Sequence, residues 1–87
     1  MLGALQEVAD SLRALSHDAE ALASLAAADA ASQASLASVQ RQHALGAASY
    51  VQLLVARQQA EQSRTGLIAA QAQRLVDSAA LWQALGG

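Results

Sequence analysis

The side chains best suited to chemistry in this sequence are two histidines and the acidic residues near the first of them. His17 and Asp18 are adjacent, Glu20 follows two positions later, and His43 lies much further along the chain. A zinc site needs three or four convergent ligands, and this stretch offers only His17 with Asp18 or Glu20. We therefore interpret these residues as exposed polar positions on a helix surface, and we predict no metal site and no cofactor.

Several serines, from Ser11 to Ser49, raise the question of a nucleophile. A catalytic serine needs a general base that is itself oriented by a third group, and the sequence has no Gly-x-Ser-x-Gly elbow. We predict that the chain is not an enzyme. A small helical enzyme or ligand binder is the alternative of a different class, and it requires a concave site with convergent polar groups.

The composition favours helices throughout. Alanine, the strongest helix former, is abundant, and proline is absent. The only aromatic residues are Tyr50 and Trp82, whereas a sheet would require more β-branched and aromatic residues. We predict an all-α fold.

A short segment near the middle provides the only strong interruption. Gly46 suits the left-handed conformation that often ends a helix, and Ser49 is a good N-cap for a second one. The sequence therefore predicts one domain over 1–87, a long antiparallel two-helix hairpin resembling a coiled coil. Its helices are expected at about 4–44 and about 49–85, with a bend at 45–48.

The apolar residues of the first helix begin as an amphipathic stripe. Leu5, Val8 and Leu12 follow one another at steps of three and four. Further on, Leu25 and Leu36 are separated by a step of eleven, which corresponds to about 3.67 residues per turn. We expect this part of the helix to be straighter than a strict coiled coil.

The second helix carries apolar residues at intervals of seven, which predicts its buried stripe. These positions are Leu53/Leu54, Ala60, Leu67/Ile68, Leu75 and Leu81/Trp82. Gly66 lies in mid-helix, where glycine costs up to about 1 kcal/mol relative to alanine. Close contact with the first helix would explain it.

Charge and size exclude several classes of function. The net charge is −2, and five basic residues face seven acidic ones, so the sequence does not predict a nucleic-acid-binding surface. The sequence has no cysteine, no long apolar run typical of a membrane span, and no signal-peptide pattern. A hairpin with one helix–helix interface buries little surface, so we expect protein partners.

Three blocks of sequence carry a family resemblance. They are 5–12 (LQEVADSL), 45–54 (LGAASYVQLL, followed by Ala56 and Gln59) and 81–87 (LWQALGG). They resemble the outer membrane efflux protein family, the TolC-like outer membrane factors, and most closely its lipoprotein branch. That family has an E-V-A-D-A-L helix start, a tip glycine before S-Y-L-x-V-L-D-A-Q, and a closing L-Y-x-A-L-G-G-G-W.

The resemblance implies a transport role. Family members are homotrimers that form a β-barrel channel in the outer membrane, continued by an α-helical barrel across the periplasm. This chain would be the C-terminal hairpin of that α-barrel. Its partners would be the other protomers and hairpins, a periplasmic adaptor protein at the tip, and indirectly the inner-membrane transporter of a tripartite efflux pump.

The resemblance also assigns residues to sites. Leu45, Gly46 and Ala47 fall on the adaptor-contacting tip motif, usually Val-Gly-Leu, and Ser49 and Tyr50 complete the expected partner-binding tip. In the same alignment, Gln52 and Val55 fall where many members place aspartates that line the channel entrance. Without carboxylates at these two positions an acidic ring cannot form, so cation binding there is not expected.

The family's β-strands, second hairpin, export signal and lipidated cysteine have no counterpart here, so the resemblance implies a fragment of a larger protein. The membrane would then be reached only through those other parts. A free-standing coiled-coil hairpin, such as that of a periplasmic adaptor, is the alternative within the binding class. Adaptor hairpins usually carry an Arg-Leu-Ser type tip, which this sequence lacks.

Overall fold

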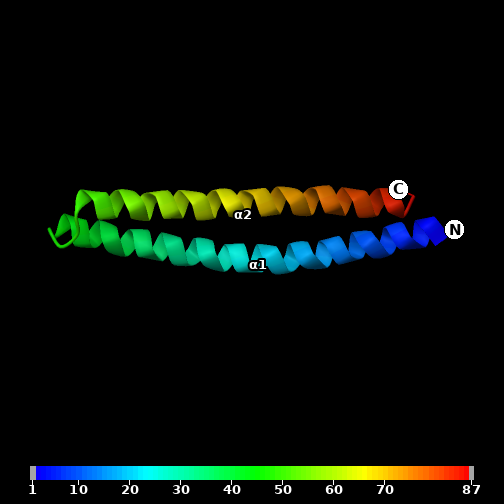
Figure 1. Ribbon diagram of the computed structural model, residues 1–87, viewed down its shortest axis with the longest axis horizontal. Helices are drawn as coiled ribbons and strands as arrows, with labels where there is room; N and C mark the ends of the chain where they lie inside the picture. Colours follow the sequence, from blue (N-terminus) through cyan, green and yellow to red (C-terminus); the bar gives the residue numbers. More distant parts are fainter. Residues whose placement is uncertain (1, 87) are drawn as a thin grey trace.

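Two long helices make up nearly all of the structure, a computed structural model that describes residues 2–86. Helix α1 spans Leu2–Ala44, helix α2 spans Tyr50–Ala84, and residues 45–49 join them. They run side by side in opposite directions, with both chain ends at the same end of the molecule (Figure 1). No strand occurs within residues 2–86. The all-α antiparallel hairpin predicted from the sequence is confirmed.

The observed helix ends differ slightly from the expected ones. Helix α1 begins two residues before position 4, while α2 begins one residue after position 49 and ends one before position 85. Differences of this size are ordinary at helix termini, where the last turns fray. Met1 and Gly87, the last residue of the closing LWQALGG block, lie outside the described residues.

The molecule is a thin rod. It measures 67 × 15 × 15 Å, as expected for helices that rise about 1.5 Å per residue. Its accessible surface is 6060 Å², whereas a compact protein of 8.9 kDa exposes about 4,800 Å². The shape therefore leaves far more side-chain surface in solvent than a globular domain of the same mass.

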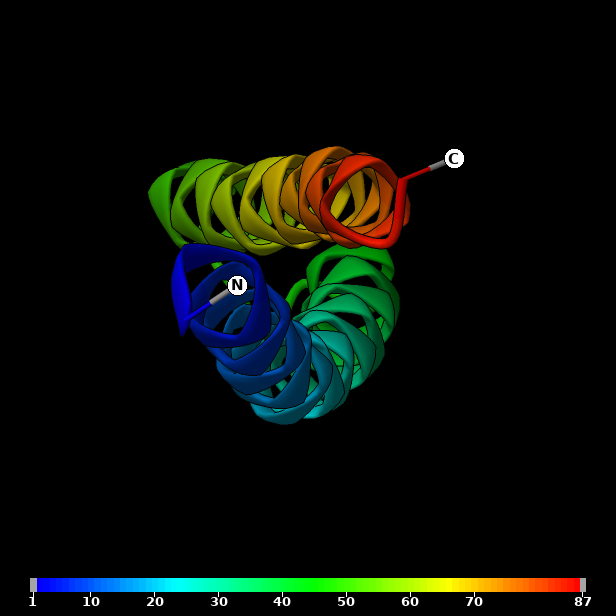
Figure 2. The ribbon, with the colours of Figure 1, turned by 90° about the vertical axis from the view of Figure 1, so that its right-hand side faces the viewer.

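The two helices face each other along one continuous interface, which we call the seam. On α1, buried and half-buried side chains follow one another from Val8 to His43 in alternating steps of three and four. On α2, a matching series runs from Leu53 to Ala84 and is interrupted at Arg74, which is exposed. A sustained seven-residue repeat makes two helices wind around each other, and the end-on view shows that they cross and that α1 is curved (Figure 2).

The expectation of a straighter segment between Leu25 and Leu36 was wrong. The seven-residue repeat continues through this stretch, but polar residues, Asp29 and Ser32, occupy its positions. Because the prediction counted only large apolar residues, it left out these two polar positions, and Leu25 and Leu36 seemed to be separated by a single step of eleven.

The predicted stripe of α2 was only partly correct. Leu53 and Ala60 are buried and Leu67 and Leu81 are half-buried, as expected, and Ala56 joins the buried set. The second members of the adjacent pairs are exposed: Leu54, Ile68 and Trp82. Leu75 is exposed too, so its predicted place in the stripe was wrong, because Arg74 occupies the seam position beside it. Consecutive helical residues point about 100° apart, so only one of each adjacent pair can enter a single seam.

The buried core is small and lies toward the bend. Leu53, Ala56 and Ala60 are the buried hydrophobic residues among those described, and two of the three are alanines. Alanine side chains bring little apolar area, so this packing stabilises the hairpin modestly. No helix within residues 2–86 combines the length and apolar character needed to cross a bilayer.

Gly66 lies against α1, but less closely than expected. A Cβ atom built at this position would be 3.7 Å from Leu25 Cδ2, which is ordinary van der Waals contact. Helix packing therefore leaves room for a methyl group at this position.

We predict that Gly66→Ala raises the free energy of unfolding by about 0.5–1 kcal/mol, because alanine loses less backbone entropy in a helix. The matched Gly46→Ala change should lower it by about 1–2 kcal/mol, because position 46 has a left-handed φ of +78°. Urea unfolding followed by circular dichroism measures both values. A loss of stability in Gly66→Ala would mean that the helices approach more closely than described.

Candidate functional site

The bend at the tip of the rod is built from local hydrogen bonds around Gly46. The Ala47 N–H donates to the Gln42 carbonyl at 2.7 Å, and the Gly46 N–H donates to the His43 carbonyl at 3.0 Å. With Gly46 at φ +78°, this pair of bonds is the Schellman motif, which satisfies carbonyl groups left open at a helix end. The role predicted for Gly46 as the end of the first helix is confirmed.

Ser49 starts α2 through a capping box. Its hydroxyl accepts from the Gln52 backbone N–H at 3.1 Å, and the Gln52 side-chain oxygen accepts from the Ser49 N–H at 2.7 Å. Two backbone donors at the start of the helix are thereby satisfied. Ser49 is the N-cap that the sequence predicted. Gln52, which the resemblance assigned to a channel entrance, has this capping role in the structure.

His43 also holds the bend, which the sequence reading missed. Its Nδ1 lies 3.0 Å from the Ala48 carbonyl oxygen, and its ring centroid is 6.2 Å from that of Tyr50. The side chain is half-buried, so the interpretation of His43 as an exposed surface residue was wrong. It is the last α1 position in the seven-residue repeat, and this was the available signal.

The residues expected to contact a partner are all accessible. Leu45 is 84 % exposed and Tyr50 60 % exposed, and Gly46, Ala47 and Ser49 are exposed as well. An isolated leucine left so exposed at a bend contributes nothing to the packing of the hairpin. The tip therefore presents a small apolar surface on a rigid turn.

Gln52 and Val55, the expected entrance residues, lie together on one side of α2. Both line a shallow groove of about 310 Å³ between the helices, next to the tip. Val51 lines the same groove and is exposed. The groove is uncharged, because its other lining residues are Ser35, Val39, Ala56 and Gln59.

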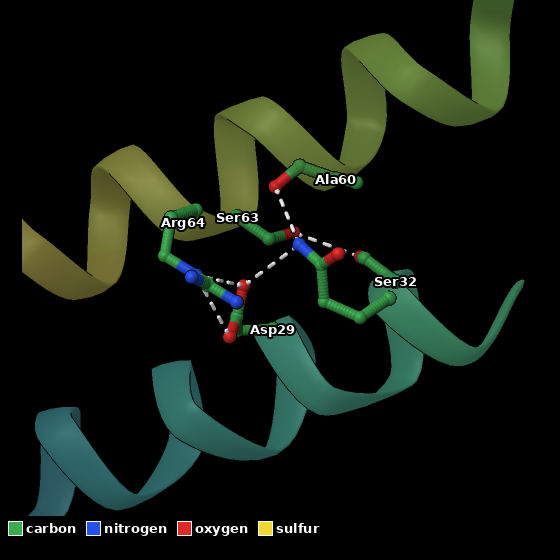
Figure 3. Close-up of polar contacts among 6 residues, drawn as sticks. Asp29, Ser32, Ala60, Ser63 and Arg64 are labelled. Carbon is green, nitrogen blue, oxygen red and sulfur yellow. Dashed lines mark hydrogen bonds and ion pairs between the residues drawn. The ribbon is translucent and has the colours of Figure 1, made fainter. Parts of the chain in front are cut away.

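A group of polar side chains crosses the seam near its middle, and we call it the central polar cluster (Figure 3). Its members are Asp29, Ser32 and Gln33 from α1 with Ser63 and Arg64 from α2. Arg64 Nε donates to both carboxylate oxygens of Asp29, at 3.1 and 3.2 Å. The hydroxyl groups of Ser32 and Ser63 lie 2.8 Å apart and share a hydrogen bond.

Gln33 links this cluster to the backbone of α2. Its amide nitrogen donates to Asp29 Oδ1 and to the Ala60 carbonyl, both at 3.4 Å. The pKa of Asp29 is lowered, mainly by the hydrogen bond from Arg64 and also by that from Gln33, against the opposing effect of burial. Asp29 is buried. Its carboxylate is held ionised by Arg64 on α2 and Gln33 on α1.

A pair of acidic residues, Asp18 and Asp77, meets in the seam closer to the chain ends. Asp18 is half-buried rather than exposed, so the interpretation of it as a surface residue was wrong. Its carboxyl group interacts with that of Asp77 across the seam, and its Oδ2 atom is buried and has no hydrogen-bond partner within the described part of the chain. His17, its neighbour, is exposed as expected.

An open groove of about 630 Å³ lies beside the central polar cluster. Arg57, Glu61 and Arg64 provide its charged groups, with Leu36 and Thr65 among the other lining residues. No group of three or more potential metal ligands occurs among residues 2–86. The arrangement consists of structural ion pairing beside a shallow surface.

Comparison with protein-family models, with curated proteins and with solved structures found no match to this chain.

We predict that Arg64→Met lowers stability, because it leaves the carboxylate of Asp29 buried beside no cation. Arg13→Met is the matched control: its partner Asp10 is exposed, and exposed pairs contribute at most about 1 kcal/mol. Urea unfolding at neutral pH should show a clearly larger loss for Arg64→Met. Equal effects would contradict a structural role for the central polar cluster.

The ion pair of Asp29 and Arg64 should also make the free energy of unfolding depend on acidic pH. Because the folded pKa of Asp29 lies below its ordinary value of 3.8, its stabilising contribution is complete above that pH and is lost as pH falls through the lower folded value. Asp29→Asn should remove this part of the acid dependence, whereas Asp10→Asn should retain it.

Proposed function

We propose that this chain is the C-terminal helical hairpin of a trimeric outer-membrane efflux channel of the TolC-like family, lipoprotein branch. The observation that carries the proposal is the long thin hairpin bent at Gly46, at the position where the resemblance places the periplasmic tip of such a channel. Its function there is structural and conductive: the hairpin forms part of the wall of the α-barrel through which a substrate passes.

The exposed face of α2 supports a place in such a wall. Leu54, Ile68, Leu75 and Trp82 belong to one seven-residue series and are between 43 % and 73 % exposed. Glu61 interrupts this series between Leu54 and Ile68. Apolar residues repeated at this spacing along a helix are typical of a contact with another helix. In the proposed channel, neighbouring hairpins of the trimer cover this series.

The tip supports contact with an adaptor. Leu45, Gly46, Ala47, Ser49 and Tyr50 are exposed at the end of the rod that lies opposite the chain termini. The Schellman motif and the capping box fix the conformation of this turn before any partner binds, which reduces the entropy lost on binding. A periplasmic adaptor is the proposed partner, and it connects the channel to an inner-membrane transporter.

The entrance residues suggest how this channel differs from many relatives. Gln52 and Val55 carry no charge, and the groove that they share has no carboxylate. In the proposed channel the tip opening would therefore lack an acidic ring and would not select cations by charge. The parent protein would reside in the outer membrane and periplasm. Parts of it other than this hairpin would cross the membrane.

We predict that the chain associates with itself through the exposed apolar series. Ile68→Glu should shift the weight-average mass toward the monomer in sedimentation equilibrium, because a carboxylate at the contact must be desolvated. Gln58→Glu, an exposed change outside the series, is the control. The emission of Trp82, the only tryptophan, should shift to the blue as the unmodified chain associates. A monomer at all concentrations would contradict the proposed wall contact.

The adaptor contact is tested by photocrosslinking in the host cell. A photoreactive amino acid at Leu45 should crosslink to the hairpin of a periplasmic adaptor, identified by mass spectrometry, and one at Glu20 should not. Crosslinks from Leu45 to a channel protein or to an inner-membrane transporter would favour the free-standing adaptor-type hairpin instead. Equal crosslinking from both positions would remove the tip as a docking site.

A further inference from the structure

The seam holds two acidic residues face to face in the half of the hairpin that packs least. Asp18 and Asp77 both occupy positions in the seven-residue repeat, one on each helix. Every buried residue among those described lies closer to the bend: Asp29, Leu53, Ala56 and Ala60. From Asp18 and Asp77 to the chain ends the seam contains only half-buried side chains, so this half depends more on its polar contacts.

Two ionised carboxylates cannot hydrogen-bond to each other, because both are acceptors. The buried Asp18 Oδ2 accordingly has no partner, whereas Asp77 Oδ1 accepts from Gln73 at 3.2 Å. A proton on one carboxyl would provide the missing donor and remove the repulsion between two negative charges. The two carboxyl groups can hydrogen-bond to each other only when the pair retains one proton.

The neighbouring positive charges oppose the protonation of Asp18 but do not cancel the rise in its pKa. Arg74 on α2 and His17 on α1 favour the ionised form of Asp18, but the pKa of Asp18 is still raised from 3.8. The first cause is the hydrogen bond that a protonated Asp18 carboxyl can make with Asp77, followed by burial and by the charge of Asp77. Arg74 is itself exposed at the gap in the α2 repeat, where solvent screens it.

We propose that Asp18 and Asp77 form a proton-controlled clasp that keeps the terminal half of the hairpin closed while they share a proton and lets it open when both are ionised. A group whose folded pKa is raised binds more protons in the folded state, so stability falls as pH rises from the ordinary value through the raised one. The central polar cluster stays intact over this range, because the pKa of Asp29 is lowered. Opening is therefore confined to the half beyond it.

The test is amide hydrogen exchange on the full chain between about pH 4.5 and about pH 8, corrected for intrinsic rates. Amides of residues 5–18 and 77–84 should open more often as pH rises, by about tenfold for each pH unit in which the pair loses its proton. Amides of residues 29–60 should not follow this change. A terminal half whose opening is independent of pH would overturn the proposal.

Asp18→Asn should hold the terminal half closed at every pH, since its amide can donate to Asp77 without titrating. Asp77→Asn should do the same, and Glu20→Gln, which removes one exposed charge from α1, should behave like the unmodified chain. His17→Gln removes the imidazole beside Asp18 but neither carboxyl group of the pair, so this variant must keep the pH dependence. Unchanged pH dependence in Asp18→Asn, or its loss in His17→Gln, would overturn the clasp.

A distance measurement provides an independent readout. The chain has no cysteine, so Ala19→Cys and Ala79→Cys place two fluorescent labels at exposed positions beside the pair. Their separation should increase with pH, and should stay constant when Asp18→Asn is added. Labels at Gln40→Cys and Gln58→Cys, on the bend side of the cluster, should report no change. Equal movement of both label pairs would indicate general unfolding and contradict a local clasp.

Discussion

A single helix–helix seam carries all of the tertiary packing within residues 2–86. Each helix has only the other to bury against, so the hairpin gains little apolar burial for its length, and much of that comes from alanine. Small residues bring the helices close together but supply little hydrophobic stabilisation. Two consequences follow: polar contacts determine how the seam is held, and the outer faces of both helices stay available to other proteins.

The polar residues divide the seam into parts with different behaviour. Asp29 is ionised and paired with Arg64, and the serine pair lies beside it, so this region is satisfied at neutral pH. Asp29 is buried while Arg64 is exposed, and their pairing favours one register over others, because any shift would leave the buried carboxylate without its partner. Asp18 and Asp77 present the opposite case, two acceptors without a donor. The molecule is therefore best held at the bend and the middle, and least well at its open end.

The sequence predicted the helices and the bend because those depend on local chemistry. Gly46 and Ser49 are recognisable from a few neighbouring residues. Helical periodicity could not decide between Leu53 and Leu54, since both fit an apolar stripe and only the position of the other helix selects one. It also passed over Asp18 and Asp29, because their partners lie on the other helix, far away in the chain. Counting positions by sevens regardless of residue type places both in the seam. Asp29 lies seven residues after Leu22, and Asp18 lies seven residues before Leu25.

The proposed place of the hairpin in a channel wall requires that neighbouring helices cover the exposed face of α2. Electron cryo-microscopy of the assembly that contains this hairpin, extracted from host membranes, tests that most directly. We expect a threefold-symmetric helical barrel with Gly46 at its open end and with Ile68, Leu75 and Trp82 packed against adjacent helices. A hairpin standing alone with these residues in solvent, or one closed into an isolated four-helix bundle, would contradict the account.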